Sequence, residues 1–359
     1  WSVCAPDMGT HAVLDRFRQI DPVVLIACDG VTYGHRDHER LSVVAQMRAE
    51  LPTVRHVIVH THLAEGDDAT QAALDAAAPC AHFASVVARD DADTAAFEPV
   101  WLPFDHPLWI VYSSGTTGLP KPIVHGHGGI LLVMRAMGAL HNDVGCSYDP
   151  AYWGERYHWY SSTGWIMWNA QVSGLLGGTT CVIFDGSPAG NRDAPDWTTL
   201  WRFAAELKVS FFGAGAAFYA NCLKLGVDLS SCGDLSAIHT LGSTGSPLTE
   251  EVQRWGTQQF RRLREAALEA DPDPAPGRPE PDQPPWGAAT RAAVERGGDL
   301  DPAPGRPKPD QPPRGAATRA AAERGGDIWW CNISGGTDFA GSFIGGVRGL
   351  PQTPGRMQC

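Results

Sequence analysis

Short apolar runs alternate with amphipathic stretches along most of this 359-residue chain. Residues 20–29 contain Val-Val-Leu-Ile-Ala-Cys, a continuous apolar run that predicts a buried strand. Residues 37–51 follow with apolar side chains at helical spacing, and residues 54–60 predict a second strand. Strand, helix and strand with fully apolar strands indicate a parallel sheet with helices on its faces. We therefore expect an α/β fold with doubly wound subdomains.

The same alternation continues towards the C-terminal end of the sequence. An apolar helix is predicted at residues 129–140, and an amphipathic helix at residues 197–207. Further strands are predicted at residues 108–112, 179–184, 209–212, 235–241 and 327–332. Residues 62–106 are rich in Ala and Asp and hold few large apolar side chains, so we expect a helix and an exposed connection there.

A tandem repeat interrupts this pattern. Two 28-residue copies, residues 273–300 and 301–328, differ only at Glu280/Lys308, Trp286/Arg314, Val294/Ala322 and Leu300/Ile328. Such a Pro-rich segment buries little, so we expect it to be disordered or extended. It would divide the chain into residues 1–270, an insert at 271–326, and a continuation at 327–359. A polyproline docking arm is an alternative, but no clean repeated ligand motif supports a protein partner.

Composition and charge exclude several classes of function. The chain is 43% hydrophobic with a formal net charge of −12 and no basic block, which disfavours a nucleic-acid partner. No run approaches the roughly 18 apolar residues of a membrane span, and no secretory signal is visible. Nine cysteines are scattered without a Cys-x-x-Cys pair, which favours a reducing, cytoplasmic setting. Residue 1 is Trp, so we expect a fragment whose true start, and any targeting segment, lies upstream.

A dense group of hydroxyls, glycines and one lysine follows the strand predicted at residues 108–112. Glycines let backbone N–H groups turn inward, hydroxyls add donors, and lysine supplies a positive charge for an anion. These residue types predict a phosphate cradle made by Ser113, Ser114, Gly115, Thr116, Thr117, Gly118 and Lys121. The loop is not a Walker A motif, because Gly-x-x-x-x-Gly-Lys-[Ser/Thr] is absent. The N-terminus of the following helix is expected to face the loop and favour an anion. The alternative is a polar surface loop.

Three further stretches hold candidate site residues. In the aromatic stretch 153–169, we expect Trp165 to line a pocket, whereas Trp159 and Trp168 are as readily core residues. The turn with Gly245, Ser246 and Pro247 follows a predicted strand, where open α/β sheets bind ligands, although a plain strand-to-helix turn is the alternative. His125 and His127 form a His-x-His pattern, but no third ligand is near in sequence, so no metal site is expected.

The last candidate group follows the strand predicted at residues 327–332. Gly335 and Gly336 are followed by Thr337 and Asp338. A hydroxyl and a carboxylate at a strand end suit a Mg²⁺–phosphate site, since Mg²⁺ takes oxygen ligands and shares them with phosphates. A capped turn is the alternative.

The loop at residues 113–121 resembles the signature loop of the adenylate-forming enzymes, which include acyl-CoA synthetases, luciferases and peptide-synthetase adenylation domains. The resemblance implies the fold of their large N-terminal domain, and a loop that handles the phosphates of ATP. It makes Lys121 and Thr337 the candidate catalytic residues, and Asp338 the magnesium ligand where most relatives have Glu. It also implies adenine contacts for Gly245, Ser246 and Pro247, although many relatives carry an acidic residue where Ser246 stands.

The amino-acid sequence at residues 1–9, 13–17 and 159–169 most resembles that of a narrower group, the acetoacetyl-CoA synthetases. In that group Trp165, Gly335 and Gly336 would shape the acyl pocket, the paired glycines leaving room for a larger acid. The implied substrates are acetoacetate, ATP with Mg²⁺, and CoA, joined through an acyl-adenylate. In the family a hinge aspartate and a small lid domain with an assisting lysine follow the Thr-Asp motif. The sequence ends at Cys359 before either, so we expect impaired catalysis. The alternatives are a ligase for another short acid, and a non-catalytic nucleotide-binding or scaffold protein.

Overall fold

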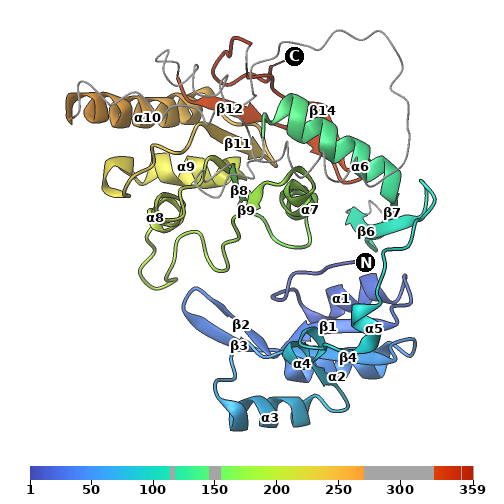
Figure 1. Cartoon of the computed structure of the whole chain (residues 1–359). Helices are drawn as coiled ribbons and strands as arrows, with labels where there is room; N and C mark the ends of the chain where they lie inside the picture. Colours follow the sequence, from blue (N-terminus) through green and yellow to red (C-terminus); the bar gives the residue numbers. More distant parts are fainter. Residues whose placement is uncertain (114–117, 145–154, 271–326, 349, 359) are drawn as a thin grey trace, which may run out of the picture.

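A five-stranded parallel sheet forms the centre of the computed structural model, which describes residues 1–113, 118–144, 155–270, 327–348 and 350–358 (Figure 1). Its strand order is β12-β11-β10-β8-β9, and each neighbouring pair is parallel. The strands are β8 (Arg156–Trp159), β9 (Thr180–Cys181), β10 (Phe211–Gly215), β11 (Thr240–Thr244) and β12 (Trp329–Asn332). The predicted α/β class with parallel sheets is therefore confirmed.

Helices cover both faces of this sheet (Figure 1). One face packs against α8 (Thr199–Glu206), α9 (Ala216–Lys224) and α10 (Glu250–Ala270), and the other lies towards α6 (His127–Ala136) and α7 (Ile166–Ser173). The first face holds the larger core, in which Trp201 of α8 stacks on Phe212 of β10 at a centroid distance of 4.4 Å. Short helical turns follow α6 (Met137–His141), α7 (Gly174–Gly177) and α9 (Leu229–Ser231).

The predicted strand at residues 235–241 is displaced along the chain. Leu235 and Ile238 are buried, but they pack into the helix-covered core from the turn that precedes β11. The strand itself begins at Thr240 and continues through Gly242. The apolar run therefore marked the core rather than the strand, because burial and strand pairing are separate constraints.

Glycines on two strands make room for Trp159, whose indole is 2% exposed. A Cβ at Gly213 would lie 2.2 Å from this indole, and one at Gly242 would lie 2.4 Å from it. Trp159 is thus a core residue that lies across β10 and β11, while Trp168 is half-buried.

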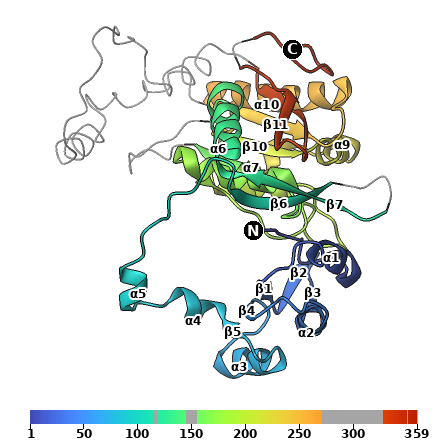
Figure 2. The same cartoon turned by 90° about the vertical axis from the view of Figure 1, so that its right-hand side faces the viewer.

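The N-terminal part contains a smaller parallel sheet with the order β1-β4-β5 (Figure 2). Its strands are Val24–Cys28, His56–His60 and Ala81–His82, and the helices beside them are α1 (Thr10–Phe17), α2 (Leu41–Glu50) and α3 (Asp67–Ala76). The predicted strand–helix–strand unit is confirmed, but residues 36–39 form β3 of a hairpin with β2 (Gly30–Tyr33) rather than the start of the helix. Residues 62–106 hold α4 (Phe83–Val87) and α5 (Ala92–Ala95) as well as α3.

An antiparallel hairpin, β6 (Pro107–Ser113) and β7 (Lys121–Gly126), lies between the two sheets in both views (Figures 1 and 2). The first residue of the chain extends it: Trp1 donates to the Leu108 carbonyl at 3.0 Å and accepts from the Ile110 N–H at 2.8 Å. A second hairpin, β13 (Ser334–Gly336) and β14 (Gly341–Ile344), follows β12.

Among the described residues, each helix is too short or too polar to span a bilayer.

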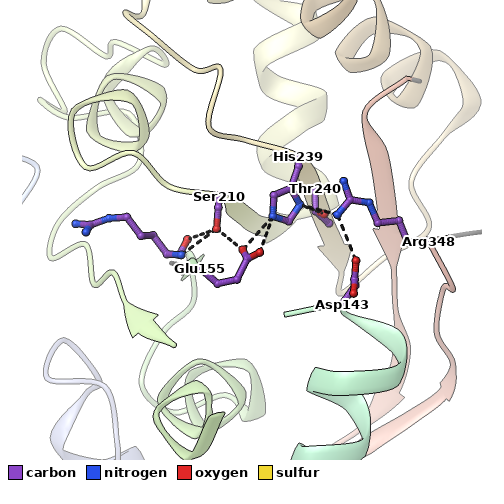
Figure 3. Close-up of polar contacts among 7 residues, drawn as sticks. Asp143, Glu155, Ser210, His239, Thr240 and Arg348 are labelled. Carbon is purple, nitrogen blue, oxygen red and sulfur yellow. Dashed lines mark hydrogen bonds and ion pairs between the residues drawn. The ribbon is translucent and has the colours of Figure 1, made fainter. Parts of the chain in front are cut away.

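A partly buried polar network occupies the edge of the large sheet at which its strands begin (Figure 3). Glu155 precedes β8 and accepts hydrogen bonds from Ser210 Oγ at 2.5 Å and His239 Nε2 at 2.9 Å. Burial raises the pKa of Glu155, but the hydrogen bonds and the nearby His239 and Arg348 outweigh burial, so the pKa is lowered overall. Arg348 extends the network by donating to Asp143 at 3.3 Å. The network ties residues far apart in sequence to one edge.

The Thr240 hydroxyl beside this network has no access to a substrate. Thr240 Oγ1 lies 2.7 Å from His239 Nδ1, and His239 Nε2 bonds Glu155, an order that resembles a hydroxyl–imidazole–carboxylate relay. Thr240 is fully buried, so its hydroxyl cannot reach a substrate, and the arrangement is structural.

The insert at residues 271–326 lies outside the described residues. Only Asp327 and Ile328 of the two 28-residue copies are described. Ile328 is 3% exposed and joins the larger core, while Asp327 forms an ion pair with Arg261 of α10 at 2.7 Å. The re-entry point of the chain is therefore fixed on α10.

Candidate functional site

Several predicted site residues follow strands of the large sheet. Because β8, β10, β11 and β12 are parallel, their carboxyl ends lie at one edge. Trp165 comes six residues after β8, Gly245 directly after β11, and Thr337 five residues after β12. Open α/β sheets bind ligands at this edge. The edge opposite the partly buried Glu155 network is thus the candidate site.

The turn after β11 leaves its three candidate residues in solvent. Gly245 has φ of +89°, a left-handed conformation that favours glycine. Gly245, Ser246 and Pro247 are all exposed. Just before them, Thr244 Oγ1 donates to the Ile333 carbonyl at 2.8 Å and joins the ends of β11 and β12. The turn is therefore anchored at its base and free at its tip, as a ligand contact requires.

Thr337 and Asp338 begin the four-residue turn between β13 and β14. The turn is held from inside by Ala340, which is 2% exposed and packs with Trp109 of β6 and Ile130 of α6. Asp338 is exposed and Thr337 is half-buried. A hydroxyl and a carboxylate thus lie on the outer side of a docked turn.

Gly335 has a backbone role in this hairpin. A Cβ at this position would lie 2.2 Å from the carbonyl oxygen of Gly341 on the partner strand. At Gly336 an added Cβ would meet the side chain of Phe339 at 2.8 Å. Close pairing of the strands is a physical reason for glycine at 335, and the predicted opening of an acyl pocket stays a prediction.

The predicted phosphate loop connects the two strands of the β6–β7 hairpin. Ser113, the last residue of β6, pairs with Lys121, the first residue of β7. Gly118 has φ of +113°, which favours glycine. The remaining predicted cradle residues, Ser114, Gly115, Thr116 and Thr117, lie outside the described residues.

The expectation that a helix N-terminus faces this loop is wrong. Strand β7 separates the loop from α6, and its six residues span about 20 Å. The first N–H groups of α6 also have partners, since His127 donates to the His106 carbonyl at 2.9 Å and Gly128 to the Phe104 carbonyl at 2.8 Å. The apolar helix was found from its pattern, but the short half-exposed strand before it was not.

Trp165 stands at the N-terminus of α7 and is 62% exposed. Its indole is therefore accessible to a ligand, although single exposed apolar side chains are common on protein surfaces. This placement accords with the predicted role as a pocket wall, which stays a prediction.

His125 lies in this region, and from the sequence it was considered only as part of a His-x-His pattern with no expected metal. Its Nε2 lies 2.9 Å from the backbone carbonyl of Thr337. A carbonyl can only accept, so the ring nitrogen carries the proton. The partners are 212 residues apart in the chain, so this contact cannot be predicted from the spacing of neighbouring residues.

Two buried polar side chains near the carboxyl edge also escaped prediction. Ser243 of β11 and Asn332 of β12 are cross-strand partners. Ser243 Oγ and Asn332 Oδ1 are buried without a hydrogen-bond partner among the described residues. A buried polar group left unpaired costs about 1–3 kcal/mol. The sequence signal that could have identified them is a polar residue at the end of each apolar strand. The pair leaves unused hydrogen-bonding groups below the Gly245 turn.

Comparison with known proteins places the chain in a family. Residues 1–268 match the family model described as AMP-binding enzyme. The chain therefore belongs to the AMP-binding enzyme family, as the signature loop predicted.

Its relatives define a narrower similarity. The chain is 37% identical to the acetoacetyl-coenzyme A synthetase of Rhizobium meliloti over 251 residues, which cover 70% of this chain and 36% of that protein. It is 33% identical to the acetoacetyl-CoA synthetase of Gallus gallus over the same shares of the two chains. The solved structure of acetoacetyl-CoA synthetase from Streptomyces lividans matches with a TM-score of 0.70 and 36% identity, covering 100% of this chain and 42% of that chain. The chain thus spans less than half the length of these relatives.

Proposed function

We propose that this chain carries the nucleotide- and acid-binding part of an acetoacetate–CoA ligase. The observation that carries the proposal is the bond from His125 to Thr337. It joins strand β7, which begins at Lys121, to the turn that carries Thr337 and Asp338. The groups predicted for phosphate chemistry therefore lie on connected segments. Similarity to acetoacetyl-CoA synthetases supports the choice of reaction.

The proposed reaction has two balanced steps. A carboxylate oxygen of acetoacetate attacks the α-phosphorus of ATP, a P–O bond forms, and the bond to pyrophosphate breaks. The CoA thiol then releases its proton to solvent, its sulfur forms a C–S bond to the acyl carbon, and the bond from that carbon to the phosphate oxygen of AMP breaks. In the first step the Lys121 ammonium and the Thr337 hydroxyl would bind phosphate oxygens, and would position the triphosphate and neutralise its charge.

Asp338 fits the role of a magnesium ligand. Mg²⁺ is commonly held by one or two carboxylates together with substrate phosphate oxygens. Asp338 is exposed, and it neighbours Thr337 in the turn, so one carboxylate is presented where the triphosphate would lie. The bound ion would supply positive charge to the phosphates.

The remaining candidates would recognise the adenosine and the acid. Gly245, Ser246 and Pro247, which are exposed, would border the adenine. Trp165, Gly335 and Gly336 would shape the acyl pocket. A ligase for another short carboxylic acid uses the same machinery and is the alternative within this class.

The cellular location proposed is the cytosol. Seven cysteines among the described residues are free thiols, and burial raises the pKa of Cys222 and Cys331 to about 12. Buried thiols of this kind resist ionisation and suit a reducing compartment.

Ligand binding to the purified 359-residue chain tests the function directly. A non-hydrolysable acetoacetyl-sulfamoyl adenosine should bind more tightly than its acetyl and butyryl analogues in a calorimetric titration. The variant Thr337→Val keeps the shape of the side chain and should weaken binding of the analogue roughly tenfold. A folded wild-type chain that binds none of the analogues would refute the proposal, and equal binding of all three would favour the alternative acid. Pyrophosphate exchange into ATP then reports whether this chain completes the first step.

A further inference from the structure

One histidine connects the two segments on which the proposed phosphate chemistry depends. His125 lies on β7 and its Nε2 bonds the carbonyl oxygen of Thr337 itself. Side chains alternate along a strand, so Lys121, Ile123 and His125 share one face of β7. Ile123 packs in the cluster that includes Ala340. This face of β7 therefore carries the lysine at one end and meets the Thr337 turn at the other.

Apolar packing holds the rest of the β13–β14 hairpin, which carries the Thr337 turn, against its neighbours. Ala340 packs against α6 and β6, and a Cβ at Gly341 would lie 3.2 Å from Val133 of α6. Ser342 Oγ donates to the Met137 sulfur at 3.2 Å. These contacts fix the inner end and one strand of the hairpin. The His125 bond is a directional contact to the Thr337–Asp338 peptide, and directional contacts set orientation where apolar packing does not.

We propose that His125 is a positioning residue, which orients the Thr337–Asp338 peptide relative to Lys121. The relevance of His125 to catalysis rests on the proposed function, whereas the contact between His125 and Thr337 does not depend on that function. A fixed peptide orients both the Thr337 hydroxyl and the Asp338 carboxylate, the two groups proposed to meet the triphosphate. His125 would touch no substrate atom. Because both the neutral Nε2–H ring and the imidazolium donate to a carbonyl, the bond does not depend on the charge of the ring.

Two substitutions separate the donor from the ring. His125→Phe keeps an aromatic ring and removes the donor, whereas His125→Gln supplies an amide N–H at a similar reach. His127→Phe is the matched control, because His127 is also half-buried, lies two residues further on, and has its ring beside that of His106 rather than bonded to the Thr337 carbonyl.

Hydrogen exchange tests the contact without any ligand. Amides of residues 334–344 should exchange roughly five- to tenfold faster in His125→Phe than in wild type, with near-wild-type protection in His125→Gln and His127→Phe. Exchange that is equal in wild type and His125→Phe would overturn the inference, whatever the protein binds.

Titration of acetoacetyl-sulfamoyl adenosine tests the consequence. The affinity should fall about fivefold or more in His125→Phe and recover in His125→Gln, while both variants melt within a few degrees of wild type. Loss of affinity without faster exchange would contradict the positioning role. If wild type binds no analogue but the exchange pattern holds, the proposed function fails and the structural link remains.

Discussion

Ser113, the last residue of β6, and Lys121, the first residue of β7, are cross-strand partners at the end of the hairpin where the chain passes from one strand to the other. This pairing fixes where β6 ends and where β7 begins, so the backbone of Lys121 is held by the sheet. A phosphate bound by the loop would meet Lys121 at a defined place.

Removing the Lys121 ammonium should weaken nucleotide binding without unfolding the chain. Lys121 is exposed, so Lys121→Ala leaves no buried cavity, and the free energy of unfolding should change by less than about 0.5 kcal/mol. A charge-assisted contact to a phosphate is worth roughly 1.5 kcal/mol or more, so the affinity for Mg·ATP should fall about tenfold. Calorimetric titration at constant ionic strength checks this.

Lys224 provides the matched control, because it is an exposed lysine at the end of α9. Lys224→Ala lowers the net charge equally but leaves the hairpin unchanged. An equal loss of affinity in both variants would show that Lys121 acts only through the overall charge of the protein, and would count against a phosphate contact.

The sequence predicted most of the large sheet and its helices, because the pattern of apolar residues that marks a strand or helix is a local property. The candidates Gly245 and Thr337 do follow strands, β11 and β12, as the sequence predicted, whereas their roles stay predictions. The hairpin β6–β7 was not predicted, because β7 is half-exposed and lacks a buried-strand pattern. His125 was missed because its partner lies on a hairpin distant in the chain. Contacts of this kind follow from tertiary packing, which the order of residues does not show.

Gly335→Ala should destabilise the hairpin that carries Thr337. The new methyl group would lie 2.2 Å from the Gly341 carbonyl oxygen, and because this neighbour is backbone, relief requires the strands to separate. Overpacking of this kind typically costs about 1–3 kcal/mol, which urea unfolding measures. Gly129→Ala on α6 is the control, since a Cβ there has no heavy atom within 4 Å and alanine favours a helix. If Gly335→Ala changed acid preference with unaltered stability, the pocket role alone would explain the glycine.

Glu155→Gln should remove part of the protein's sensitivity to acid. The folded-state pKa of Glu155 lies below its ordinary value of 4.5, because hydrogen bonds from His239 and Ser210 and the charges of His239 and Arg348 outweigh burial. The ionised group therefore stabilises the fold above about pH 5, and that stability is lost as the pH falls through the folded-state pKa. Wild type should be more stable than Glu155→Gln by about 2 kcal/mol at pH 7, with the difference shrinking below pH 4.5.

Urea titrations at several pH values measure this difference. Glu206→Gln, at an exposed position of α8, should follow wild type at every pH. A gap between wild type and Glu155→Gln that stays constant down to pH 3 would mean that the ionisation of Glu155 is not coupled to folding.

Replacing residues 271–326 should stabilise the chain if they form a flexible connection, as their composition predicts. Loop-closure entropy grows with the logarithm of length, so exchanging these 56 residues for a ten-residue Gly/Ser linker should raise the free energy of unfolding by about 1.5 kcal/mol. Arg261 bonds Asp327, and α10 continues for about 13 Å beyond Arg261. Ten residues reach up to roughly 33 Å, which suffices. A 56-residue Gly/Ser segment should match wild type, whereas a loss of more than about 2 kcal/mol with that segment would show that the native residues contribute packing.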